Sequence, residues 1–119
     1  MKVRLLNGSS EDVIIKNFLL ERNGFCKSKF QEQVRKELIE KYPNDIICEE
    51  VYIKGEKFYL DFFLPTLKTV IEVNGRQHKE HVKFFHRTKQ DFDKQILTDK
   101  RKKNWCDING FKMIEINYE

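Results

Sequence analysis

The sequence predicts an α/β (α+β) fold in which three helices and about four strands form one domain. Three strand-like runs follow one another over residues 45–74, each bounded by a proline, a glycine or a short polar turn. Helical patterns precede and follow this block, and a last strand-like run closes the sequence. With 119 residues, 39% of them hydrophobic and 35% charged, the chain has the size and composition of a single domain with one core.

We expect residues 1–24 to form a helical addition to a core that spans residues 25–119. The stretch "SSEDVIIKNFLLERNG" offers Ser9 and Ser10 as N-caps and carries acids in its first turn. It ends on Gly24, a residue type that favours the C-terminal end of a helix. The pattern therefore predicts an N-terminal helix of about three turns.

The central part of the sequence predicts a second helix and three strands. The helix should run from about Ser28 to Tyr42, because a proline follows directly. Strands are expected in "DIICEEVYI" (45–53), "FYLDFFLP" (58–65) and "KTVIEVN" (68–74). The connection between the last two is short, so we expect them to pair as an antiparallel hairpin.

The C-terminal part predicts a long helix and a final strand. Residues from about 87 to 109 have a helical pattern, and Gly110 stands where a left-handed C-terminal cap would lie. The run "FKMIEINY" (111–118) then returns as a strand.

The composition argues against a membrane-spanning protein and favours a polyanionic ligand. No run approaches the roughly 18 apolar residues of a membrane span, so a cytoplasmic protein is expected. The net charge of +4 is unevenly distributed, because residues 76–104 contain ten Lys or Arg and four Asp or Glu. Such a cationic segment attracts polyanions, most often nucleic acid. The alternative is that these charged residues form a solvent-exposed helix face that binds no ligand.

Two acids interrupt the predicted hairpin. Asp61 and Glu72 lie within runs that are otherwise apolar. Because side chains alternate along a strand, Leu60 and Phe62 should share the face opposite Asp61, and the two acids should project side by side. Neighbouring carboxylates in an apolar setting repel one another and are costly to desolvate, so a divalent cation would stabilise them. The alternative is that each acid pairs with a Lys or Arg.

These two segments resemble a known family of nucleases. "LDFFLP" followed by "VIEVNGRQH" is similar to the PD-(D/E)XK nuclease superfamily, near the very-short-patch repair endonucleases and the catalytic domains of phage homing endonucleases. The resemblance spans about Cys26 to Tyr118. It implies a restriction-endonuclease-like core, with a central mixed sheet flanked by helices, and hydrolysis of phosphodiester bonds in a bacterial or phage-infected cell. By the resemblance, Asp61 is the metal-binding aspartate and Glu72 begins the (D/E)XK element.

The sequence departs from the superfamily pattern at one position. Asn74 stands where the superfamily most often has Lys, and an amide is not a cation and donates protons poorly. The very-short-patch branch uses histidine just after this strand, so the resemblance implies His78 as general acid or base. The alternative is a loop histidine that contacts DNA phosphate or nothing.

Two helical positions complete the predicted site. On the second helix Gln31 falls within the apolar stripe while Glu32 points away, and related nucleases place Glu or Gln beside the metal, which favours Gln31. Glu37 and Glu32 are the alternatives. On the last helix, homing-type relatives carry an Asp in this region, which suggests that Asp99 binds a second metal or orients the histidine. Asp99 could instead pair with Lys103.

The resemblance and the charge pattern together predict a mechanism. Asp61, Glu72 and a backbone carbonyl near Val73 would hold Mg²⁺ (or Mn²⁺), and Lys102 or Lys103 would stabilise charge on the phosphate. The expected partner is double-stranded DNA, and a homodimer is left open. Four basic residues would grip the DNA backbone: Arg76, Lys79, Lys83 and Arg87. The alternatives are a catalytically inactive nucleic-acid-binding module with this fold and a structure-selective junction resolvase.

Overall fold

The computed structural model describes residues 1–20, 29–74 and 89–117. Its helices and strands are β1 (Lys2–Arg4), β2 (Ser10–Asp12), a 3₁₀ helix (Ile15–Phe18), α1 (Lys29–Lys41), β3 (Cys48–Ile53), β4 (Phe58–Leu64), β5 (Thr69–Asn74), α2 (Lys89–Asn109) and β6 (Lys112–Asn117).

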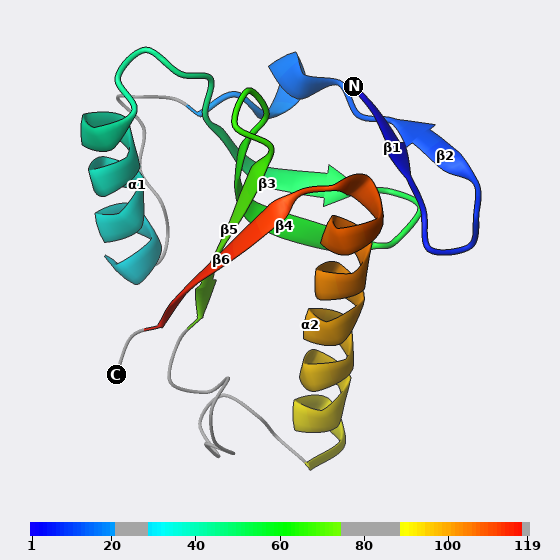
Figure 1. The fold of residues 1–119 in the computed structure, drawn as a ribbon. Helices are drawn as coiled ribbons and strands as arrows, with labels where there is room; N and C mark the ends of the chain where they lie inside the picture. The colour runs from blue at the N-terminus through cyan, green and yellow to red at the C-terminus, as the bar shows by residue number, and fades with distance from the viewer. Residues whose placement is uncertain (21–28, 75–88, 118–119) are drawn as a thin grey trace.

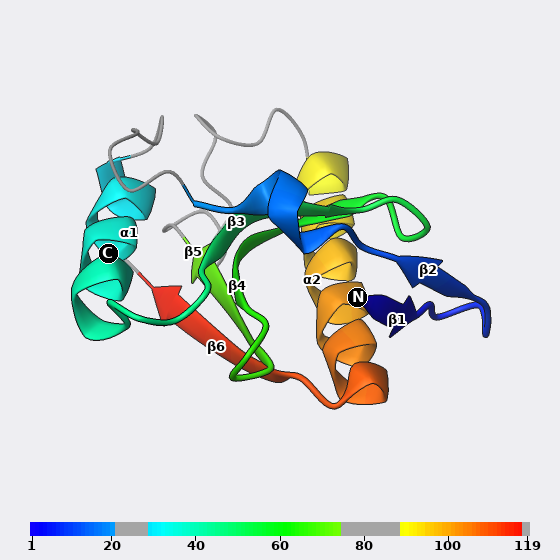
Figure 2. The ribbon, with the colours of Figure 1, turned by 90° about the horizontal axis from the view of Figure 1, so that it is seen from above.

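A four-stranded mixed sheet forms the centre of the domain, as predicted. The strand order is β3-β4-β5-β6, with antiparallel pairing between β3 and β4 and between β4 and β5. β6 runs parallel to β5, because α2 carries the chain back along the sheet between them. Figures 1 and 2 show α1 and α2 on opposite sides of this sheet.

Each helix covers its own apolar core. The α2-side core contains Trp105 and Cys106 of α2 together with buried residues of the sheet and of the N-terminal segment. The α1-side core contains Val34 and Leu38 of α1 with the buried side chains of Ile47, Phe62, Leu64 and Ile71. The two central strands, β4 and β5, are therefore largely buried, which suits their mainly apolar runs.

Most predicted elements agree with the structure. α1, the β4–β5 hairpin and α2 lie within a few residues of the ranges expected from the sequence. Gly110 has φ of 70°, so it does end α2 in the left-handed conformation. None of the helices in the described part of the chain is long and apolar enough to cross a membrane.

The predicted N-terminal helix is wrong over the described residues 9–20. β1 and β2 form an antiparallel hairpin instead, and only a short 3₁₀ helix follows. The cause is turn chemistry: Gly8 has φ of 93°, and the Asn7 side chain accepts a hydrogen bond from the Ser9 N–H at 2.9 Å. An Asn-Gly pair favours a hairpin turn, so the serines belong to a turn and a strand rather than to a helix cap.

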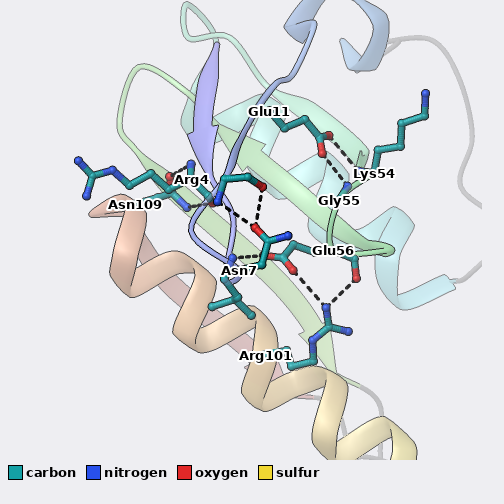
Figure 3. A network of polar contacts seen from close by, with 10 residues as sticks. Arg4, Asn7, Glu11, Lys54, Gly55, Glu56, Arg101 and Asn109 are labelled. Atoms are coloured by element: carbon teal, nitrogen blue, oxygen red, sulfur yellow. Dashed lines mark hydrogen bonds and ion pairs between the residues drawn. The ribbon is translucent and has the colours of Figure 1, made fainter.

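Polar contacts hold this N-terminal segment against the rest of the domain (Figure 3). The Glu11 carboxylate accepts hydrogen bonds from the Lys54 and Gly55 N–H groups at 2.9 and 2.6 Å. The Asn109 side chain, at the end of α2, bonds both the N–H and the carbonyl of Arg4 at 2.7 and 3.0 Å. Asn109 thus pairs with the outer edge of β1 as a neighbouring strand would.

Candidate functional site

The two acids of the hairpin lie side by side in the structure. The β4–β5 register pairs Phe62 with Ile71, and the same register places Asp61 opposite Glu72. Here side chains replace the backbone ladder: the Asp61 N–H donates to Glu72 Oε2 at 2.8 Å, and the Val73 N–H donates to Asp61 Oδ2 at 2.8 Å. The hairpin therefore holds the two carboxyl groups close together between the strands.

The strands are distorted at this point, contrary to the predicted alternation. Leu60 packs in the α2-side core, whereas Phe62 packs in the α1-side core, so the prediction that they share a face is wrong. Glu50, which the β3–β4 register places opposite Asp61, has φ of 49°. A residue in this left-handed conformation interrupts the regular pleat, so the paired strands change face around Asp61.

A lysine from α2 contacts the buried acid. Lys102 Nζ lies 2.7 Å from Glu72 Oε1, which is a short ion pair with a hydrogen bond. Both side chains are largely removed from solvent, with 14% of Lys102 and 8% of Glu72 exposed. The ammonium also lies 5.9 Å from the centre of the Phe58 ring. These contacts place a cation beside the two acids.

Burial strongly raises the pKa of Glu72. Its pKa rises from 4.5 to about 7, first because of desolvation and then because of repulsion by the Asp61 carboxylate, while the charge and hydrogen bond of Lys102 lower it. Glu72 therefore takes up a proton at a higher pH than an exposed glutamate does. An additional cation at these acids would favour the ionised form.

The site continues into a small hollow between the sheet and α2. Glu72, Lys102 and Asp99 line it together with Met113 and Glu115 of β6. Sequence reasoning missed Glu115. The parallel β5–β6 register places Glu115 directly beside Glu72, and only that register identifies it, because the two residues are far apart in the chain.

The site residues predicted on the two helices lie in different places. Asp99 lines the hollow beside Lys102, whereas α1, with Gln31 in its first turn, packs on the α1-side core. Both Gln31 and Glu32 are half-buried, and Glu37 is exposed. Glu32 does not simply point away, since it lies 3.6 Å from the guanidinium of the buried Arg35. The inward face of α1 thus includes an arginine among its apolar residues.

The remaining candidates are exposed or fall outside the described residues. Lys103 is 65% exposed and lies 3.9 Å from Glu115. His78 lies outside the described residues, as do the four predicted DNA-gripping residues Arg76, Lys79, Lys83 and Arg87. Within the described ranges, no group of three or more His, Cys, Asp or Glu side chains is arranged to hold a metal ion.

Three viral proteins are similar to part of this chain. Uncharacterized protein 094L of Frog virus 3 (isolate Goorha) is 43% identical over 65 residues, which is 54% of this chain and 42% of that protein. Uncharacterized protein 033L of Invertebrate iridescent virus 3 is 38% identical over 66 residues, 56% of this chain and 34% of that protein. Uncharacterized protein 307L of Invertebrate iridescent virus 6 is 36% identical over 59 residues, 50% of this chain and 30% of that protein.

The chain thus matches less than half of the length of each of these viral relatives. No protein-family model matches the sequence. No solved structure matches the chain.

Proposed function

We propose that this chain is a metal-dependent DNA endonuclease that hydrolyses phosphodiester bonds, with the PD-(D/E)XK type of site. One observation carries the proposal. Asp61 and Glu72 lie on adjacent strands, and the ammonium of Lys102 lies 2.7 Å from Glu72. Two acids and one lysine are the residue types that this superfamily uses, and the lysine comes from α2 instead of β5.

The donor set fits a magnesium-type ion. Mg²⁺ usually binds proteins through one or two carboxylates and completes its shell with waters and substrate phosphate, so it does not require a cluster of three or more protein ligands. Asp61 and Glu72, with a backbone carbonyl near Val73, would hold Mg²⁺ or Mn²⁺. When bound, such an ion polarises the scissile phosphate and acidifies an attacking water.

Lys102 supplies the positive charge that Asn74 does not provide. Its ammonium lies beside the acids, so it is placed to neutralise negative charge on a phosphate oxygen held there. His78 is proposed to accept or relay the proton of the attacking water. Asp99 and Glu115 border Lys102 and would limit how far the ammonium moves.

The proposed substrate is double-stranded DNA. The excess of Lys and Arg over residues 76–104 supports a polyanionic partner, and Arg76, Lys79, Lys83 and Arg87 would contact the DNA backbone. Because the similar proteins are viral, we place this activity in a virus-infected cell.

A second candidate is a nucleic-acid-binding module with the same fold and no catalysis. It is favoured by the contacts that already engage the carboxylates, which are backbone N–H groups and Lys102. A junction resolvase is a variant of the enzyme proposal with a branched substrate.

Nicking of supercoiled plasmid tests the proposal. Wild-type protein with Mg²⁺ or Mn²⁺ should produce relaxed circles, and Asp61→Asn should abolish nicking. Asp12→Asn, an exposed acid on β2 with the same charge change, serves as the matched control and should cleave normally. If wild type and Asp61→Asn leave the plasmid equally intact, the binding-module alternative replaces the enzyme. Faster cleavage of branched than of linear oligonucleotides would indicate the resolvase.

A further inference from the structure

We propose that Lys102 is an internal competitor of the divalent metal: its ammonium holds Glu72 until the ion binds, and then moves toward Asp99 and Glu115. This inference rests on the proposed metal site. It goes further by assigning to one lysine the control of metal affinity.

The ammonium and a metal ion bound at the two acids would use the same carboxylate of Glu72. Lys102 Nζ lies 2.7 Å from Glu72 Oε1, while Glu72 Oε2 accepts the Asp61 N–H at 2.8 Å. A divalent ion bound to Oε1 would lie within a few ångströms of the ammonium if Lys102 did not move. The low exposure of both side chains leaves little solvent to screen that repulsion.

The hollow contains two acids toward which the Lys102 ammonium would move. Asp99 precedes Lys102 by three residues on α2, a spacing that places both on one side of the helix. Glu115 lies beside Glu72 in the sheet and lines the same hollow. A lysine side chain has a flexible four-carbon stem, so we expect changes of rotamer to turn its ammonium toward these acids.

Contacts of Phe58 and Arg101 hold the part of α2 that carries Lys102. The Phe58 ring lies 5.9 Å from Lys102 Nζ and 5.8 Å from the Arg101 guanidinium. Arg101 is fixed in turn by hydrogen bonds to the carbonyl and the carboxylate of Glu56 at 3.0 and 3.2 Å. Because these contacts hold α2 in place, movement is confined to the Lys102 side chain.

Titration of the full chain with Mn²⁺ alone, followed by calorimetry, tests the proposal. Lys102→Met keeps the length of the side chain and removes the charge, so it should bind Mn²⁺ more tightly by about fivefold or more. Lys100→Met removes an exposed charge from the same helix and should change the affinity by less than about twofold, because exposed charges are screened. Asp99→Asn should weaken Mn²⁺ binding, and this weakening should disappear in the Lys102→Met background.

The outcomes separate this inference from the proposed function. Equal or weaker Mn²⁺ binding by folded Lys102→Met, with wild type binding the ion, overturns the competition and keeps the metal site. Absence of Mn²⁺ binding in both proteins overturns the competition and the metal site together.

A measurement on the wild-type protein covers the case in which Lys102→Met does not fold. Modification of lysines by an amine-reactive reagent, read by mass spectrometry, should increase at Lys102 when Mg²⁺ is added and stay constant at the exposed Lys100. Unchanged protection of Lys102 at saturating Mg²⁺ would overturn the proposal.

Discussion

At the scale of single residues, Glu72 combines burial with charge. A carboxylate side chain that is 8% exposed is unusual, because charged side chains are rarely this deeply buried unless they are paired. Here it is retained with two hydrogen-bond donors, the Asp61 N–H and Lys102 Nζ. Such a residue destabilises the folded chain when it is ionised, and the proposed metal ion would offset that cost.

The raised pKa of Glu72 predicts a pH-dependent stability. Because the folded chain binds this proton more tightly than the unfolded chain, the ionised acid costs up to about 3 kcal/mol above pH 7, and the cost vanishes as the pH falls from about 7 to 4.5. Glu72→Gln should therefore unfold at higher denaturant concentration than wild type at pH 8, with a smaller difference at pH 5. Exposed Glu37→Gln is the control. A stability gain of Glu72→Gln that grows as the pH falls to 5 would contradict the raised pKa of Glu72.

The backbone conformation of Glu50 predicts a second effect on stability. Its φ of 49° is strained for any residue with a Cβ, and glycine adopts this conformation without that cost. We expect Glu50→Gly to raise the free energy of unfolding by about 0.5–1 kcal/mol, after the greater flexibility of unfolded glycine is subtracted. Glu50→Ala removes the same carboxylate and keeps the strain, so chemical denaturation of the two variants separates the causes. Equal stability of the two would show that strain is not the reason.

At the scale of elements, the N-terminal hairpin is part of the domain's packing. Val3, Leu5 and Val13 belong to the α2-side core, so residues 1–20 are joined to it by apolar contacts as well as by hydrogen bonds. The Asn7-Gly8 turn favours the hairpin locally, but the pattern of residues 9–24 does not show its packing, because the partners of the segment are the 54–57 turn and the end of α2. The turn and these tertiary contacts together outweighed a weak helical propensity.

Glu56 should be the most sensitive residue of this junction. It is buried, accepts the Leu6 N–H at 2.6 Å and pairs with Arg101 at 3.2 Å (Figure 3). Glu56→Ala leaves the Leu6 N–H without its acceptor and leaves Arg101 with only the backbone carbonyl of residue 56, so it should cost roughly 2–4 kcal/mol. Glu56→Gln keeps an oxygen for Leu6 and should cost less. Thermal unfolding measures both, and a loss below about 0.5 kcal/mol for Glu56→Ala would contradict the role of Glu56.

At the scale of the whole molecule, two chain segments far apart in sequence build the candidate site. The β4–β5 hairpin supplies Asp61 and Glu72, and α2 supplies Lys102. α2 also connects β5 to β6, so the crossover that completes the sheet carries the lysine to the acids. The same topology brings Glu115 beside Glu72.

Binding of DNA should follow the charge distribution of the whole chain. If residues 76–87 contact phosphates, replacing their four cations by Ala should reduce the slope of log K against log salt by about three to four units for duplex DNA. The control removes the same charge from exposed positions elsewhere: Lys2, Lys16, Lys36 and Lys41. Fluorescence anisotropy with a labelled duplex measures both, and equal slopes for the two quadruple variants would exclude a localised contact.

The sequence by itself determined the four strands of the sheet, both long helices and the proximity of the two acids, because these depend on local periodicity, turn residues and one short hairpin connection. Only the tertiary structure decided that the N-terminal hairpin packs on the α2-side core, that the strands change face at Asp61, and that Lys102 and Glu115 border Glu72. Those features arise from contacts between segments distant in the chain, and the periodicity of a single segment carries no information about its distant partners.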